Sequence, residues 1–114
     1  MSLPLRLEDE ASAELTDAAR WYEERQPGLG RRYLQAVDTI FQQIARHPKA
    51  GAPAPQVAPE LGVRRAPITS FPYAVIYLEL PAEIRILAIV HDRRRPGYWL
   101  SRVSGILSAS FPHS

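Results

Sequence analysis

Two apolar runs, separated by only three residues, constrain the fold of this chain more than any other feature. Residues 73–80 are almost wholly apolar, and the run 84–90 is interrupted only by Arg85. The length and content of each run predict a β-strand, and the link Pro81-Ala82-Glu83 between them is tight. Strands this apolar need cover on at least one face, so another part of the chain has to form a second layer.

Two predicted helices supply that layer. The first spans residues 9–25 and places four apolar side chains on one helical face: Ala11, Leu15, Ala18 and Tyr22. The second spans residues 29–46 and has a clearer stripe of the same kind: Tyr33, Val37, Ile40, Phe41 and Ile44. The short turn Gln26-Pro27-Gly28 predicts that the helices form an antiparallel hairpin. Trp21 and Tyr22 lie within the first helix and are expected to be packing groups.

The remaining segments indicate an α+β fold. Residues 3–7 and 63–68 are predicted strands, and Pro67 cannot donate to a ladder, so the second of these should be an edge strand or end in a bulge. Residues 47–60, rich in Pro and Ala, form a connector. The expected fold is a two-layer α+β domain, with the helix hairpin packed on a small, mainly antiparallel sheet.

The C-terminal residues 100–114 are weakly patterned. They are expected to be either a frayed tail or a short helix docked on the sheet. The domain itself is assigned to residues 1–102, and residues 103–114 to a C-terminal tail or short docking segment.

Composition excludes several kinds of site. The chain has 114 residues, enough for one domain, and no cysteine, which excludes disulfides, thiolate metal sites and cysteine nucleophiles. His47, His91 and His113 occur in unrelated contexts, and no phosphate-binding glycine loop or Gly-x-Ser-x-Gly elbow is present. We therefore expect no cofactor and no metal. No window is long enough for a membrane span and no signal peptide is recognisable, so we expect a cytoplasmic protein without membrane association.

Charge is distributed unevenly along the chain. Residues 1–60 carry 9 acids and 7 bases, a balance of −2, whereas residues 61–114 carry 3 acids and 7 bases, a balance of +4. All bases except Lys49 are arginine, whose planar fork suits phosphate and carboxylate. An arginine-rich genome would give the same bias. A basic half implies an acidic partner, either nucleic acid or an acidic protein surface.

The basic residues gather at two places. His91 and the arginines Arg93, Arg94 and Arg95 follow the apolar run 84–90, so the end of a strand presents them together. Arg64 and Arg65 lie on the predicted strand 63–68, where neighbouring side chains point to opposite faces.

Strands that are neighbours in an antiparallel sheet would join these groups into one basic surface. The alternative is a solvated basic rim that only keeps the domain soluble. The following segment, Pro96-Gly97-Tyr98-Trp99, is expected to be a turn whose aromatics pack back on the domain.

Several motifs together resemble the RelE/ParE superfamily of bacterial toxins. The matching segments occur in order between about residue 3 and residue 102: Ala18–Glu24, Pro27–Gly30, Phe41–Pro48, Gly51, Val63–Arg65, Phe71–Tyr77 and His91–Trp99. The Pro-Gly-Leu-Gly turn and the Phe-Pro-Tyr strand start favour the ParE-like branch. The resemblance implies a β-α-α-β-β-β fold, which agrees with the elements predicted from periodicity.

The resemblance also implies a role and a partner. Such proteins are toxins of type II toxin–antitoxin systems, and a cognate antitoxin wraps and blocks the toxin with a C-terminal segment that folds on binding. We therefore expect a toxin–antitoxin hetero-oligomer. The groove between the helix hairpin and the sheet edge is the expected docking site, and acidic antitoxin residues would complement the basic half.

Two activities follow from the two branches of the superfamily. ParE-like members bind DNA gyrase and stall it without catalysis; the target-binding residues would then be Arg64, Arg65, His91, Arg93, Arg94 and Arg95. This activity is favoured. RelE-like members cleave messenger RNA on the ribosome, which needs acid–base groups and cations around the phosphate.

For RNA cleavage the catalytic candidates are His91, Arg65 and Tyr98, but the lysine-rich set that RelE-like nucleases use is missing. A detoxified member that retains only antitoxin binding is a further alternative. A DNA-binding module is disfavoured because no recognition helix is basic, and in such systems operator binding usually belongs to the antitoxin.

Overall fold

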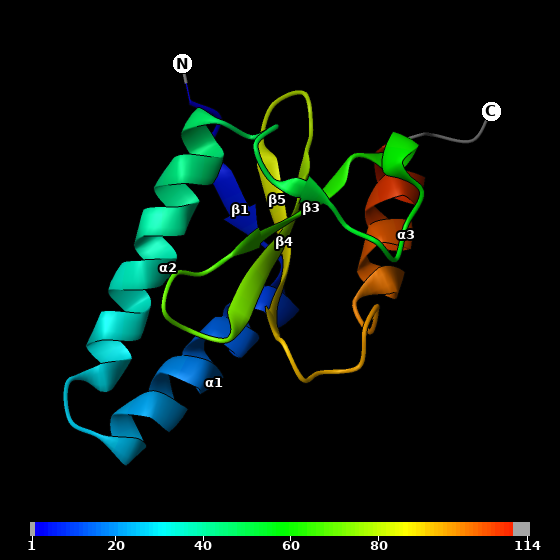
Figure 1. Cartoon of the computed structure of the whole chain (residues 1–114). Helices are drawn as coiled ribbons and strands as arrows, with labels where there is room; N and C mark the ends of the chain where they lie inside the picture. The colour runs from blue at the N-terminus through cyan, green and yellow to red at the C-terminus, as the bar shows by residue number, and fades with distance from the viewer. Residues whose placement is uncertain (1, 111–114) are drawn as a thin grey trace.

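The computed structural model describes residues 2–110 as a five-stranded mixed sheet with helices on both of its faces (Figure 1). The strand order is β1-β5-β4-β3-β2. The elements in chain order are β1 (Leu5–Leu7), α1 (Asp9–Arg25), α2 (Leu29–Arg46), β2 (Ala52–Pro53), the short 3-10 helix η1 (Pro59–Leu61), β3 (Val63–Pro67), β4 (Tyr73–Glu79), β5 (Ile84–His91) and α3 (Leu100–Ser110). The predicted α+β class and both predicted helices are confirmed.

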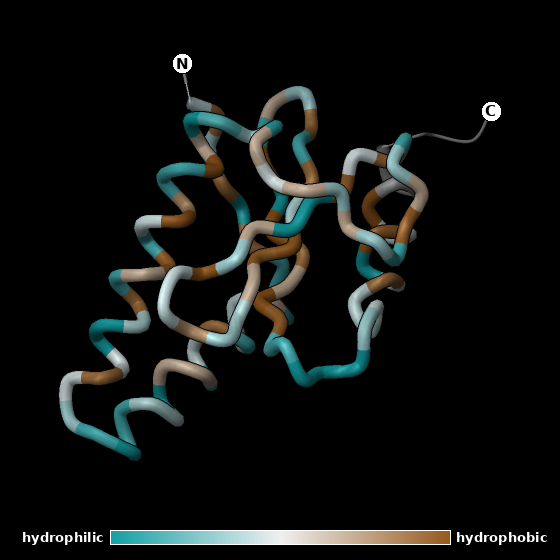
Figure 2. The backbone as a smooth tube through the Cα atoms, in the orientation of Figure 1, coloured by the Kyte–Doolittle hydropathy of each residue, from teal (hydrophilic) through white to brown (hydrophobic). Residues whose placement is uncertain are grey.

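The helix hairpin covers one face of the sheet and forms the larger core. Tyr33, Val37 and Ile44 of α2 are buried against the sheet. The strands contribute the buried residues Val75, Tyr77, Ile84, Ile86 and Ile89 to the same cluster. Figure 2 shows the hydrophobic residues concentrated along the central strands, whereas the turn after β5 is hydrophilic. The apolar stripes predicted for the two helices therefore form the helical half of this core.

Helix α3 covers the other face and adds a third layer to the two that were predicted. Trp99, Val103 and Ile106 are buried there against Val63, Leu87 and other strand residues. Residues 100–110 are thus a docked helix rather than a frayed tail. Residues 111–114, including His113, lie outside the described residues.

The sheet edge differs from the prediction. Residues Ala52 and Pro53 form the two-residue strand β2, which pairs with Arg65 and Arg64, so β3 is covered over part of its length. Pro67, which suggested an edge strand, is the last residue of β3. A strand of two residues inside a Pro-rich connector has no periodicity, so no sequence pattern predicts it.

A bulge in β5 determines which face its last residues use. The pairing moves from Tyr77↔Ile86 to Ile76↔Ala88, so Leu87 is an extra residue opposite β4. Leu87 and Ala88 both lie in the core under α3, whereas Ile89 returns to the core under the hairpin. Because a bulge re-aims the residues that follow it, the His91 ring lies beside Tyr73, with ring centroids 4.9 Å apart.

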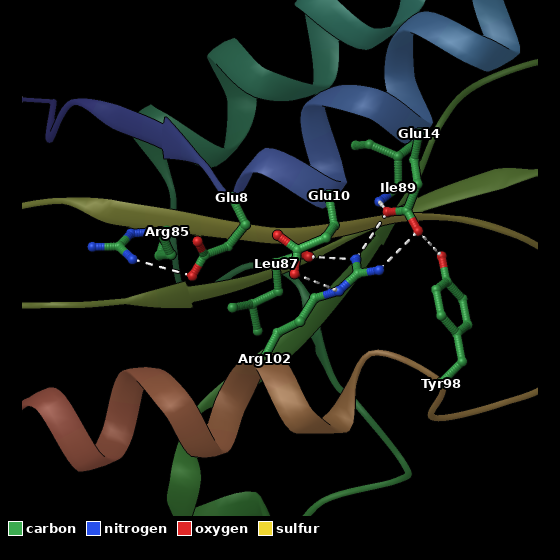
Figure 3. A network of polar contacts seen from close by, with 8 residues as sticks. All are labelled: Glu8, Glu10, Glu14, Arg85, Leu87, Ile89, Tyr98 and Arg102. Carbon is green, nitrogen blue, oxygen red and sulfur yellow. Dashed lines mark hydrogen bonds and ion pairs between the residues drawn. The ribbon is translucent and has the colours of Figure 1, made fainter.

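An ion pair closes the outer edge of β5. Strand β1 is parallel to β5 and pairs with it only as far as Leu7↔Ile86. Beyond that point the Glu14 carboxylate accepts a hydrogen bond from the Ile89 N–H at 3.1 Å, and the Arg102 guanidinium donates to the Leu87 carbonyl at 2.9 Å. Arg102 also donates to Glu14 at 3.0 Å (Figure 3). Helices α1 and α3 thus meet around the edge of the sheet.

No helix within residues 2–110 is both long enough and apolar enough to cross a membrane.

The two helices of the hairpin approach each other closely at Gly30. A Cβ placed there would lie 2.6 Å from the Ala19 carbonyl oxygen. The Glu23 carboxylate accepts hydrogen bonds from the N–H groups of Gly28 and Gly30, at 3.0 and 3.1 Å, and so lies at the positive N-terminal end of α2. The Pro-Gly-Leu-Gly turn therefore fixes the spacing of the hairpin.

We predict that Gly30→Ala destabilises the protein, because the new methyl group meets backbone that cannot move aside. The expected loss in free energy of unfolding is roughly 1–3 kcal/mol, the usual cost of overpacking. Gly105→Ala in α3 is the matched control, since a Cβ there meets nothing within 4 Å, and it should stabilise by up to ~1 kcal/mol. Urea unfolding of both variants measures the difference, and equal midpoints would contradict the prediction.

Candidate functional site

The arginine turn, residues 92–95, follows β5 and carries three exposed arginines. Its backbone is fixed by two hydrogen bonds of 2.9 Å, from the Asp92 N–H to the Pro72 carbonyl and from the Arg94 N–H to the His91 carbonyl. The Arg93 N–H donates to His91 Nδ1 at 3.0 Å. An accepting Nδ1 carries no proton, so the neutral ring has its N–H at Nε2.

The side chain of Arg94 stacks on an aromatic ring. Its guanidinium carbon lies 4.1 Å from the centre of the Tyr98 ring. The Tyr98 hydroxyl donates to Glu14 at 2.5 Å. Burial first, and then the hydrogen bond to Glu14, raise the pKa of Tyr98 well above its usual value. The hydroxyl therefore keeps its proton at neutral pH and is a donor rather than a base.

Strand alternation separates the two neighbouring arginines of β3. The Arg65 guanidinium pairs with Asp92 at 3.1 Å and lies next to the arginine turn. The Arg64 guanidinium donates to the Gly51 carbonyl at 2.7 Å, beside Tyr77. Arg65 therefore joins His91 and the arginine turn in one basic region, whereas Arg64 supports the connector before β2.

Two hollows flank the end of β5. The larger, of about 570 Å³, lies toward the helix hairpin and includes Trp21, Tyr73, His91, Arg94 and Tyr98 in its lining. The smaller, of about 180 Å³, lies toward α3 and includes Arg65, His91, Arg94, Arg95 and Tyr98. His91, Arg94 and Tyr98 thus form the partition between the two hollows.

The aromatic pair of α1 has two different roles. Tyr22 packs into a cluster with Tyr33, Phe71 and Tyr73, as expected for a packing group. The expectation is wrong for Trp21, which is 49% exposed and lies at the larger hollow with Arg25 stacked 4.2 Å from its ring centre. Adjacent helix positions point about 100° apart, so the two side chains cannot share one environment.

The chemistry available at this site is mainly recognition of negative charge. Two groups suited to acid–base chemistry form hydrogen bonds: His91 Nδ1 accepts from the Arg93 N–H, and the Tyr98 hydroxyl donates to Glu14. His91 Nε2 forms no hydrogen bond with the residues in the range 2–110. The guanidinium edges of the arginine turn are exposed and suit phosphate or carboxylate. Within residues 2–110, no three His, Cys, Asp or Glu side chains lie close enough together to hold a metal ion.

A second surface, the α2 groove, follows one side of α2. Two hollows of about 580 and 720 Å³ succeed one another along the helix. The residues that line them from the helix side are Leu29, Arg32, Gln35, Ala36, Thr39, Ile40, Gln43, Ile44 and, directly after the helix, His47. The opposite wall comes from Ala66 and Pro67 of β3 and from the turn 69–71. This is the groove between hairpin and sheet edge that the sequence led us to expect.

Some residues that organise these surfaces have no signal in the sequence. Glu14 and Arg102 meet although they are 88 residues apart in the chain. The Tyr77 hydroxyl donates to the Pro48 carbonyl at 2.7 Å and accepts from the Gly51 N–H at 3.1 Å, which fixes the connector after α2. Only the three-dimensional arrangement identifies these contacts.

Comparison with known proteins agrees with the fold and places the chain in a family. The family model for the ParE toxin of type II toxin–antitoxin systems, parDE, matches residues 5–96. A solved structure described as the chromosomal ParDE TA system from P. aeruginosa has the same fold, with a TM-score of 0.66 and 22% identity over 79% of this chain and 96% of that chain. No curated protein matches the chain. Because the family model covers most of its length, the chain belongs to the ParE toxin family of type II toxin–antitoxin systems.

Proposed function

We propose that this toxin binds DNA gyrase through the arginine turn and stalls the enzyme on cleaved DNA, without catalysis by the toxin. The observation that carries the proposal is the combination of three exposed arginines with a Tyr98 hydroxyl that already donates to Glu14. Exposed guanidinium groups suit both carboxylates and phosphates, and gyrase bound to DNA offers both. The proposal implies a cytoplasmic site of action, where gyrase works.

The proposed neutralising partner is a cognate antitoxin that docks in the α2 groove. The groove has apolar walls at Ala36, Ile40 and Phe71, with the guanidinium of Arg32 near one end and the imidazole of His47 near the other. A segment that folds on binding needs apolar surface to offset its ordering entropy, and acidic residues on it would pair with Arg32. Arg65 lines the groove and also pairs with Asp92 of the arginine turn, but the other residues of the two surfaces differ. Substitutions that spare Arg65 therefore test the antitoxin and target surfaces separately.

The alternative activity is ribosome-dependent cleavage of messenger RNA. One observation favours it: Arg65, His91 and Tyr98 line the same small hollow. In that case His91 Nε2 would transfer a proton and Arg65 would hold the phosphate. The raised pKa of Tyr98 argues against a base role for that residue, which leaves His91 as the decisive residue.

We predict that the purified protein inhibits gyrase supercoiling and accumulates cleaved DNA. Reversing the charge of the arginine turn with Arg93→Glu, Arg94→Glu and Arg95→Glu should lower the inhibitory potency by roughly a hundredfold, because several charged contacts become repulsive. The matched control makes the same charge change at the exposed residues Arg6, Arg31 and Arg46 and should retain inhibition.

The His91→Ala variant separates the two activities. Gyrase inhibition should fall by roughly tenfold at most, because one contact and the hydrogen bond to the Arg93 N–H are lost but no proton transfer is needed. RNA cleavage should fall by about 10²-fold or more if His91 is an acid–base group. Messenger RNA cut at ribosome-bound codons in cells with intact DNA would overturn the gyrase proposal.

For the antitoxin we predict that Thr39→Glu with Gln43→Glu weakens binding by roughly tenfold, because two negative charges enter a groove that faces acidic residues. Gyrase inhibition by the free toxin should be unchanged. Leu34→Glu with Gln42→Glu is the control, because these exposed residues of α2 lie outside the groove lining. Titration calorimetry with the antitoxin encoded beside the toxin measures the affinity, and equal losses for both pairs would exclude the groove.

A further inference from the structure

We infer that Glu14 and Tyr98 are positioning residues that hold Arg94 ready for binding, and that Arg94, rather than Arg93 or Arg95, is the anchor of the arginine turn. The inference rests on the proposal that this turn contacts the toxin's target. It goes further by assigning unequal roles to three consecutive arginines that the sequence presents as equivalent.

The three side chains differ in their surroundings. The Arg94 guanidinium lies 4.1 Å from the Tyr98 ring centre, so one of its faces is covered while its N–H edges remain available. The side chains of Arg93 and Arg95 form no hydrogen bond, ion pair or cation–π contact with other residues in the range 2–110. Arg94 therefore has less rotamer freedom to lose when it binds a partner.

The ring under Arg94 is itself held in place. Its hydroxyl donates to Glu14, and the Arg102 guanidinium carbon lies 5.3 Å from its centre (Figure 3). The next residue, Trp99, is only 2% exposed and anchors the chain under the sheet. Tyr98 can therefore neither swing out nor turn without breaking these contacts.

Glu14 connects this ring to the rigid part of the fold. It projects from α1, accepts from the Ile89 N–H of β5, and is bridged by Arg102 of α3 at 3.0 Å (Figure 3). An unbroken series of contacts thus runs from two helices and a central strand through Glu14 and Tyr98 to Arg94. Binding groups held by packed elements are placed more accurately than groups on free loops.

Position supports the same ranking. Arg94 lines both hollows at the end of β5, Arg95 lines only the smaller, and Arg93 lines neither. Residues that dominate a binding interface lie near its centre and are commonly Tyr, Trp or Arg. A stacked Arg94 between two hollows fits that description, whereas Arg93 and Arg95 would lie at the rim.

Single substitutions test the ranking. In gyrase inhibition and in growth arrest, Arg94→Ala should lower potency by roughly tenfold or more, as for a central interface residue, and Arg93→Ala and Arg95→Ala by less than about threefold each. Tyr98→Leu should match Arg94→Ala, and Tyr98→Phe should recover part of the loss because the ring remains. Equal losses for the three arginines would overturn the inference.

A double-mutant cycle tests the positioning role. Glu14→Gln alone should lower the potency of the toxin. In the Arg94→Ala background it should cause little further loss, because coupled residues are non-additive. In the Arg95→Ala background it should cause the same loss as in the parent toxin. Glu24→Gln, at an exposed position of the same helix, is the control and should have no effect. Additive losses for Glu14→Gln and Arg94→Ala would overturn the positioning role. Thermal unfolding of each variant identifies any loss that comes from misfolding.

Side-chain dynamics separate this inference from the proposed function. In the free protein, NMR relaxation of the arginine Nε–H groups should show Arg94 more ordered than Arg93 and Arg95, and Tyr98→Leu should abolish the difference. If the parent toxin leaves gyrase unaffected, the proposed function fails, yet the order at Arg94 and the growth-arrest cycle still decide this inference. Three equally mobile arginines would refute it whatever the target.

Discussion

The ion pair between Glu14 and Arg102 joins all three layers of this small domain. Both side chains are largely buried, with exposed fractions of 16% and 13%, and burying charges is costly unless every polar group is satisfied. The Ile89 N–H, the Leu87 carbonyl and the Tyr98 hydroxyl are further hydrogen-bond partners, and the Glu10 carboxylate lies 3.8 Å from Arg102. Burial opposes the charge on Arg102, yet the hydrogen bond and charge of Glu14 outweigh it, and the pKa of Arg102 is raised. Arg102 therefore keeps its positive charge beside Glu14 at neutral pH.

The same pair solves a general problem of open sheets. Strand β1 is too short to cover β5, and the uncovered edge of a central strand is a template for pairing with other chains. Side chains from α1 and α3 take the place of the missing strand. At the opposite end of the sheet, Pro53 and Pro67 withhold the backbone donors that an added strand would need. The sheet is thus protected at both edges by different means.

Helices and long strands were predictable here because each depends on a local, repeated pattern. The apolar stripes of residues 9–25 and 29–46 and the runs 73–80 and 84–90 all became elements close to the expected bounds. The features that were not predictable depend on single residues or distant pairs: the two-residue β2, the bulge at Leu87 and the pairing of Glu14 with Arg102. The basic residues of the candidate site were visible in the sequence, but the difference between Arg94 and its neighbours depends on Tyr98 and was not.

The bulge at Leu87 changes how related sequences should be aligned. Strand residues alternate between the two faces of the sheet. Deletion of Leu87 would therefore move the side chains on one side of it, either those up to His91 or those before it, to the opposite face. A one-residue gap here is therefore a change of architecture, not a small length variation within a strand. In an alignment of homologues, the residues after the bulge should be matched by counting back from the arginine turn. The residues before the bulge should be matched by counting forward from the link 81–83. A relative without the bulge would present its histidine to α3 and not to the hairpin.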